Sequence, residues 1–148
     1  DVTALLKQCG YPGMKVLEFA FDSRDGGDYR PHSYPKNCIA YVGTHDNEPV
    51  NSWMETAAPE DVARAVRYLN LTKKEGYHWG MMRGIWSSAA DLAVVQAQDL
   101  LGLGHESRMN TPSTLGGNWC WRAEPGVFNT RLAKKLHSEM ELYGRLPE

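Results

Sequence analysis

The sequence predicts an α/β fold, and within that class the C-terminal part of a (β/α)8 barrel, about strands 6 to 8 with their helices. First, an apolar run at 38–43 stops at a polar cluster, as strands of parallel sheets do at their carboxyl ends. Second, strand-like segments alternate with long loops and helical segments. Third, the three identifiable strands would leave exposed edges and apolar faces in an isolated sheet. We therefore expect residues 1–148 to form a single unit that is incomplete as a barrel.

The first segments predict a helix and then a strand. Residues 2–9 carry an apolar face, and the glycines and proline at 10–13 end the helix. Residues 14–21 are apolar apart from Lys15 and Glu18, which favours a strand. Because an unpaired charge is costly to bury, we expect Glu18 to form an ion pair in the barrel interior rather than to contact substrate.

A long loop and a second strand follow. The loop at 22–37 is rich in Asp, Gly, Arg and Pro and has no periodicity, and such loops are often functional. His32 lies there between two prolines, which favours an ordered loop, so we retain it as a candidate site residue. The segment 38–43 predicts a buried strand that delivers the polar cluster 45–47 to its carboxyl end.

Helical segments come next. Pro59 followed by two acidic residues is typical of a helix start, and the apolar positions Val62, Ala65, Val66 and Leu69 continue it. A second helical segment covers 77–90. We expect its aromatic and methionine side chains at helical spacing to lie in the core rather than to form a ligand platform; these are Trp79, Met82 and Trp86.

The last third of the chain predicts a strand, a loop and a helix. Residues 91–99 are short and apolar enough for a buried strand that ends at Gln98 and Asp99. An irregular stretch at 105–122 follows, and a final amphipathic helix runs from about Asn129, its N-cap, to Tyr143.

Composition limits the classes of partner. The formal net charge is −2 and the basic residues are spread out, so we expect no nucleic-acid partner and no membrane partner. The three cysteines show no paired spacing, which favours buried thiols in a reducing, cytoplasmic protein over a disulfide or redox role. The first residue is not methionine, which suggests a fragment.

The polar cluster after the second strand carries the chemistry. Asp46 is flanked by His45 and Asn47, and the loops supply Trp, Tyr, Arg and Asn. This set suits a carbohydrate cleft, because carboxylates and amides bind sugar hydroxyls and aromatic rings cover sugar C–H faces. We expect no metal site, since no metal-ligand spacing is present. We also expect no nucleotide or other cofactor, because the glycines at 102–104 lack the dinucleotide pattern.

Four motifs in this order resemble the C-terminal third of the 4-α-glucanotransferases, the amylomaltase or disproportionating enzyme family. They are Gly10-Tyr11-Pro12-Gly13-Met14-Lys15-Val16-Leu17-Glu18-Phe19-Ala20-Phe21, Gly43-Thr44-His45-Asp46-Asn47, the segment from Gln98 to Gly104 with Ser107-Arg108-Met109-Asn110, and Gly117-Asn118-Trp119-Cys120-Trp121-Arg122. The resemblance covers nearly the whole chain.

The resemblance implies a cytoplasmic enzyme that transfers α-1,4-glucan segments between maltooligosaccharides through a covalent glycosyl-enzyme. Asp46 matches the third acid of the family, which stabilises the transition state, and the family's nucleophile Asp and acid/base Glu would precede residue 1. The implied substrate-binding residues are His45, Asn47, Arg108, Asn110 and His32. We expect the isolated chain to be inactive and to associate with a second copy or with its missing barrel half.

Two departures and two alternatives accompany this resemblance. The family usually has Asp where this chain has Glu48, and Asn where it has Ser33, which leaves the local loop contacts open. One alternative is a non-catalytic glucan-binding or self-assembling half-barrel module. The other is a fragment of an α-glucan hydrolase, because the same carboxylates serve transfer to water and transfer to a sugar.

Overall fold

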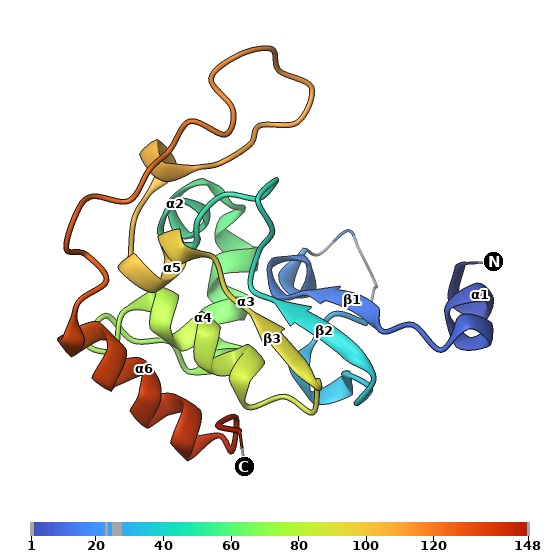
Figure 1. Ribbon diagram of the computed structural model, residues 1–148. Coiled ribbons are helices and arrows are strands. Elements are labelled where there is room, and N and C mark those ends of the chain that lie inside the picture. The colour runs from blue at the N-terminus through green and yellow to red at the C-terminus, as the bar shows by residue number, and fades with distance from the viewer. Residues whose placement is uncertain (1, 23, 25–27, 148) are drawn as a thin grey trace.

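A three-stranded parallel sheet forms the centre of the computed structural model, which describes residues 2–22, 24 and 28–147. The strands are β1 (Gly13–Val16), β2 (Cys38–Tyr41) and β3 (Leu92–Val94), in that spatial order (Figure 1). In the register, Met14 pairs with Ile39, and Ile39 pairs with Leu92. The predicted α/β class with parallel strands is therefore confirmed.

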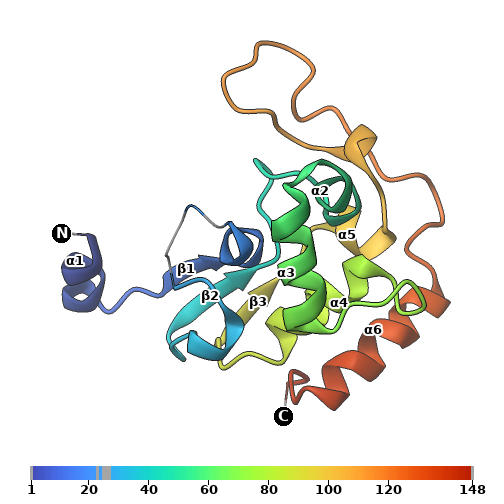
Figure 2. The same ribbon diagram turned by 180° about the vertical axis from the view of Figure 1, so that it is seen from behind.

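The helices are α1 (Val2–Cys9), α2 (Val50–Thr56), α3 (Pro59–Leu69), α4 (Tyr77–Trp86), α5 (Ala97–Leu101) and α6 (Thr130–Leu142). Short 3-10 helices are η1 (Leu17–Phe21), η2 (Pro31–Ser33) and η3 (His105–Ser107). Figures 1 and 2 show α1 and the loop after η3 projecting from the rest of the chain. None of the helices formed by the described residues is long and apolar enough for a membrane span.

Two predicted strands are too long. The first ends at Val16 and continues as η1, because the ladder closes where the Glu18 N–H donates to the Val42 carbonyl and a helical turn follows. The third ends at Val94, and α5 then places Gln98 and Asp99 in a helix instead of at a strand end. A short apolar run is compatible with either a strand or a buried helical turn, so periodicity cannot separate them.

The core lies between the sheet and α2, α3 and α4. Cys38, Ala40 and Val42 are buried on the side that contacts the helices. The predicted core positions of α4 are confirmed, because Trp79, Met82 and Trp86 are all buried. On the other face of the sheet, Met14 is 58% and Leu92 is 52% exposed, so that face is open.

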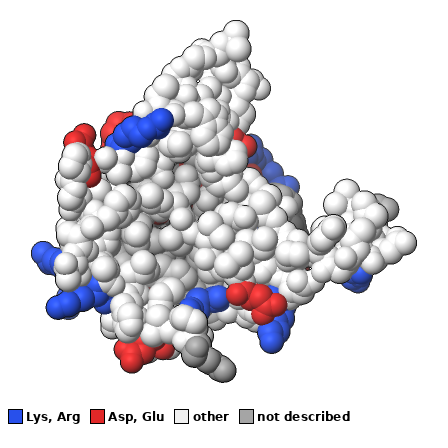
Figure 3. Space-filling view, in the orientation of Figure 1, with Lys and Arg blue, Asp and Glu red and all other residues white. Residues whose placement is uncertain are grey.

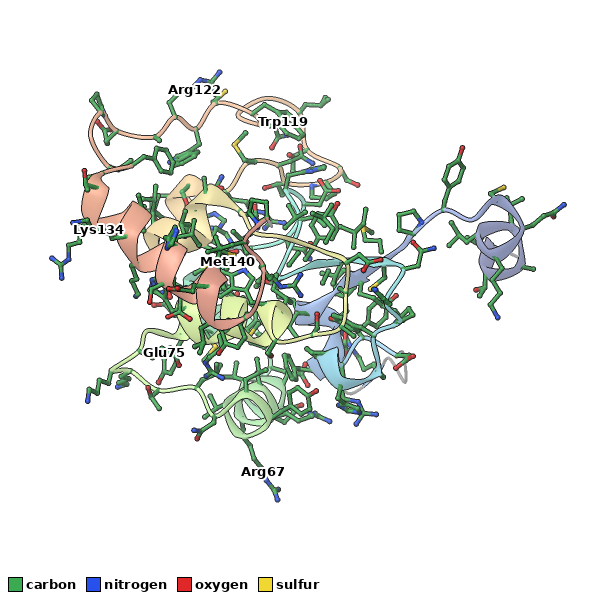
Figure 4. All side chains as sticks on the ribbon, turned by 60° about the horizontal axis from the view of Figure 1, so that its bottom comes forward. Arg67, Glu75, Trp119, Arg122, Lys134 and Met140 are labelled. Atoms are coloured by element: carbon green, nitrogen blue, oxygen red, sulfur yellow. The ribbon has the colours of Figure 1, made fainter. Side chains whose placement is uncertain are left out.

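Helix α6 covers α4 and begins at its predicted cap. The Leu132 N–H donates to the Asn129 side chain at 3.1 Å, which confirms Asn129 as N-cap. On its inner face, Leu132, Leu136 and Met140 pack against the core. Figure 4 shows Lys134 pointing away from the molecule on the outer side.

The expectation of buried thiols holds for one cysteine. Cys38 lies in β2 and is buried, whereas Cys9 and Cys120 are exposed. Cys9 is exposed because it ends α1, which has no buried residues. On the face seen in Figure 3, charged side chains lie around the rim and uncharged residues cover the centre.

Candidate functional site

A tight turn after β2 presents Asp46. The Thr44 N–H and hydroxyl both donate to Asn47 Oδ1, at 2.9 and 2.8 Å, and the Asn47 N–H donates to the Thr44 carbonyl at 3.0 Å. An Asn side chain that bonds the backbone of its own turn fixes the turn's shape. Asn47 therefore acts on the backbone, and the Asp46 side chain stays 48% exposed at the tip.

The Asp46 carboxylate is held from two sides. Its Oδ1 accepts a hydrogen bond from the Asn110 amide at 2.6 Å and lies 3.4 Å from His45 Nε2. The Asn110 backbone N–H donates to the His45 carbonyl at 3.1 Å, so the segment after η3 lies along the turn. The His45 ring lies 4.8 Å from the Trp119 ring, on the loop labelled in Figure 4.

Arg108 contacts this turn, but its donors point to protein groups. Its Nη2 donates to the Asp46 carbonyl at 2.6 Å, and its Nε donates to the Asn110 carbonyl at 3.0 Å. Its Nη1 donates to the Glu48 carboxylate. A guanidinium with a fixed fork of donors suits such a clamp between segments. This geometry supports positioning, rather than direct substrate contact, as the role of Arg108.

Glu48 receives donors from three segments. Besides Arg108, it accepts from Ser52 Oγ at 2.8 Å and lies 2.9 Å from His105 Nδ1. Burial raises the pKa of Glu48, but the hydrogen bonds from His105 and Ser52 and the charge of Arg108 lower it below the ordinary value. Glu48 is therefore ionised at neutral pH.

Two other acids lie under the site in a different state. Glu18 is 4% exposed, and burial, followed by the charges of Asp99 and Glu48, raises its pKa well above the ordinary value. Within the described residues, Glu18 Oε1 has no hydrogen-bond partner, so the predicted ion pair is not formed. Burial likewise raises the pKa of Asp99 to about 6, although Asp99 accepts the Val50 N–H at 2.7 Å. Desolvation therefore favours the neutral form of both groups.

The site borders a cavity of about 640 Å³. Its lining comes from the ends of β1 and β2 and from α2 and α3, and it combines carboxylate, guanidinium, amide and aromatic groups. The lining includes Glu18, Phe19, Asp22, Asp46, Asn47, Glu48, Trp53 and Arg108. Sequence reasoning missed Phe19, Asp22 and Trp53 as lining residues, and for Asp22 the signal was its place directly after the first apolar run.

His32 does not join this cluster. Its Nδ1 lies 2.7 Å from the Tyr68 hydroxyl, and it lines a separate cavity of about 520 Å³ with residues of α3 and α4. That cavity includes Ser88 and Ala89, which precede β3, and η2 itself precedes β2. It therefore lies toward the amino ends of the strands, whereas Asp46 follows a carboxyl end.

The fold is α/β, and its cavity lies at the carboxyl ends of parallel strands, where enzymes of this class carry their sites. The chain belongs to the 4-alpha-glucanotransferase family, whose model matches residues 1–128. The resemblance that the motifs predicted is thereby confirmed.

Relatives and a solved structure agree with this assignment. The chain is 49% identical over 140 residues to a 4-alpha-glucanotransferase of Clostridium butyricum, with 94% of this chain and 29% of the relative covered. It is 43% identical to one of Synechocystis, with 98% and 29% covered. The structure is similar to amylomaltase from Streptococcus agalactiae in complex with acarbose, at a TM-score of 0.92 and 35% identity, covering 99% of this chain and 30% of that one. The chain thus spans less than a third of these proteins.

Proposed function

We propose that the full-length protein containing this chain is a 4-α-glucanotransferase, which moves α-1,4-glucan segments between maltooligosaccharides by a retaining double displacement. In this proposal the chain supplies the third acid, Asp46, and the nucleophile and acid/base lie in a preceding part of a (β/α)8 barrel. The observation that carries the proposal is the Asp46 carboxylate, held at the edge of the cavity by Asn110 at 2.6 Å.

The geometry suits transition-state stabilisation. Glycosyl transfer passes through an oxocarbenium-like state, and a fixed negative charge stabilises it more than the neutral ground state. Asp46 is half-exposed, and Asn110 occupies Oδ1, which leaves the second oxygen available for sugar hydroxyls. The His45 ring, which lies tilted against the Trp119 ring, is placed to add a ring nitrogen beside the same carboxylate.

The similar structure supports the proposed substrate class. The structure of that amylomaltase was solved in complex with acarbose, and 99% of the present chain superimposes on part of it. We propose maltooligosaccharides as donors and acceptors. For the compartment we propose the cytoplasm, although a plant relative, from Arabidopsis thaliana, is named chloroplastic/amyloplastic.

Product analysis tests the function. The full-length protein incubated with maltotriose should release glucose together with maltooligosaccharides longer than the substrate. Residues 1–148 alone should give neither product. Glucose and maltose without longer products from the full-length protein would indicate a hydrolase instead, and transfer by the isolated chain would contradict the proposed division of the acids.

A further inference from the structure

Glu48 gathers three parts of the site into one network. Its carboxylate accepts donors from Ser52 of α2, from His105 of η3 and from Arg108, and its side chain is 19% exposed. These partners lie up to 60 residues away along the chain. Glu48 follows Asp46 by two residues, so it joins the turn that presents Asp46 to the segment that supplies Asn110.

The contacts of Arg108 explain how Glu48 affects the position of Asp46. Nη2 holds the Asp46 carbonyl and Nε holds the Asn110 carbonyl, so one guanidinium spans both halves of the Asp46–Asn110 hydrogen bond. The guanidinium donors of Arg108 are spread over three acceptors, and the strongest of these bonds is the one to its carboxylate partner, because both groups in it are charged. In the described residues that partner is Glu48.

The neighbouring acids do not substitute for Glu48. Among the described residues neither Glu18 nor Asp99 forms an ion pair with Arg108, whereas the Glu48 carboxylate lies directly beside it. His105 adds a second donor on the exposed side. The negative charge that orients Arg108 is therefore the charge of Glu48.

We propose that Glu48 is a positioning residue, which acts through Arg108 to hold the Asp46 carboxylate in its reactive orientation. The inference rests on the proposed transferase function. A displacement of a reacting group by about 1 Å lowers a rate roughly 100-fold, so partial loss of this support should be visible in turnover.

The test compares Glu48→Gln and Glu48→Asp in the full-length protein with maltotriose as substrate. Glu48→Gln should lower kcat roughly tenfold with KM nearly unchanged, because the interaction matters in the transition state. Glu48→Asp keeps the charge beside Arg108 and should recover most of kcat. A Glu48→Gln variant with parental kcat would overturn the proposal. So would a Glu48→Asp variant whose kcat is no higher than that of Glu48→Gln.

A matched variant and a double variant separate positioning from folding. Glu75→Gln removes the carboxylate from another half-buried arginine pair, with Arg83, near the start of α4 (Figure 4). It should lower Tm and leave kcat unchanged. In an Asp46→Ala background, Glu48→Gln should cause no further loss of kcat, because no carboxylate remains to be positioned. An equal loss in both backgrounds would overturn the proposal.

The unaltered protein keeps the two hypotheses apart. If it transfers glucan segments and Glu48→Gln does so equally well, the positioning role fails and the proposed function stands. If the unaltered protein performs no transfer, both fail together.

Discussion

The acidic residues in and beneath the site differ in solvent contact. Asp46 is half-exposed and bonded to an amide, whereas Glu18 and Asp99 are buried and their pKa values are raised by desolvation. In the sequence all three are simply acids within or directly after apolar runs. The difference in burial is what makes Asp46 the acid accessible from the cavity.

The raised pKa of Asp99 predicts a pH-dependent stability. Its pKa moves from 3.8 to about 6 in the folded protein, which corresponds to roughly 3 kcal/mol. Because the folded state holds the proton more tightly, this stabilisation is fully present below pH 4 and is lost as the pH rises through about 6.

Asp99→Asn should remove this dependence while keeping an acceptor for the Val50 N–H. The Tm of the variant relative to that of the parent should therefore rise as the pH is raised from 4 to 7.5. Asp99→Asn also removes the charge that helps to raise the pKa of Glu18, so the difference in Tm reports Asp99 together with its effect on Glu18. A difference in Tm that is constant across this range would contradict the buried, neutral state.

At the scale of elements, helix starts could be predicted from the sequence, whereas the ends of strands and the long-range side-chain contacts could not. The cap at Asn129 and the start of α3 at Pro59 follow from local chemistry and were predicted correctly. The breaks after Val16 and Val94 depend on where ladder partners end, which no local pattern encodes. The Arg108–Glu48 link spans 60 residues, so its detection required the folded arrangement.

The end of α4 depends on a distant arginine. Arg145 donates to the carbonyls of Ile85, Trp86, Ser88 and Ala90. They lie at and beyond a helix C-terminus, where carbonyls lack the usual helical donor; Ile85 also accepts from Ser88.

Arg145→Ala should therefore lower the free energy of unfolding by about 2 kcal/mol, because it removes the arginine donor from the carbonyls of Trp86, Ser88 and Ala90. Its kcat/KM should be unchanged, since the contacts of Arg145 lie at the amino side of β3. Denaturant unfolding provides the measurement. Arg67 points to solvent in Figure 4, so Arg67→Ala is the control variant. Equal stability of the two variants would contradict the stabilising role of the Arg145 hydrogen bonds.

The whole molecule is a sheet covered on one face. Met14 and Leu92 share the open face and are more than half exposed, and the chain spans about 30% of its relatives. Apolar patches of this kind mark association surfaces. We propose that this face meets the rest of the barrel in the full-length protein and a second copy when the chain is isolated.

Size-exclusion chromatography of residues 1–148 should thus show a species larger than 16.6 kDa. Leu92→Lys should shift the elution position toward that of the monomer, because a charged side chain opposes burial of the open sheet face. Leu115→Lys is the control, since Leu115 is fully exposed on the projecting loop. A monomeric parent chain, or an equal effect of both substitutions, would argue against association through the sheet face.

The central claim is that Asp46 stabilises the transition state of glucan transfer. The most direct measurement is steady-state kinetics of Asp46→Ala in the full-length protein with maltotriose. Asp91→Asn is the control, because Asp91 precedes β3 at its amino end, whereas Asp46 follows the carboxyl end of β2. The account predicts a fall in kcat on the order of 100-fold or more with little change in KM, and parental kinetics for the control. An Asp46→Ala protein that keeps most of its kcat would contradict it.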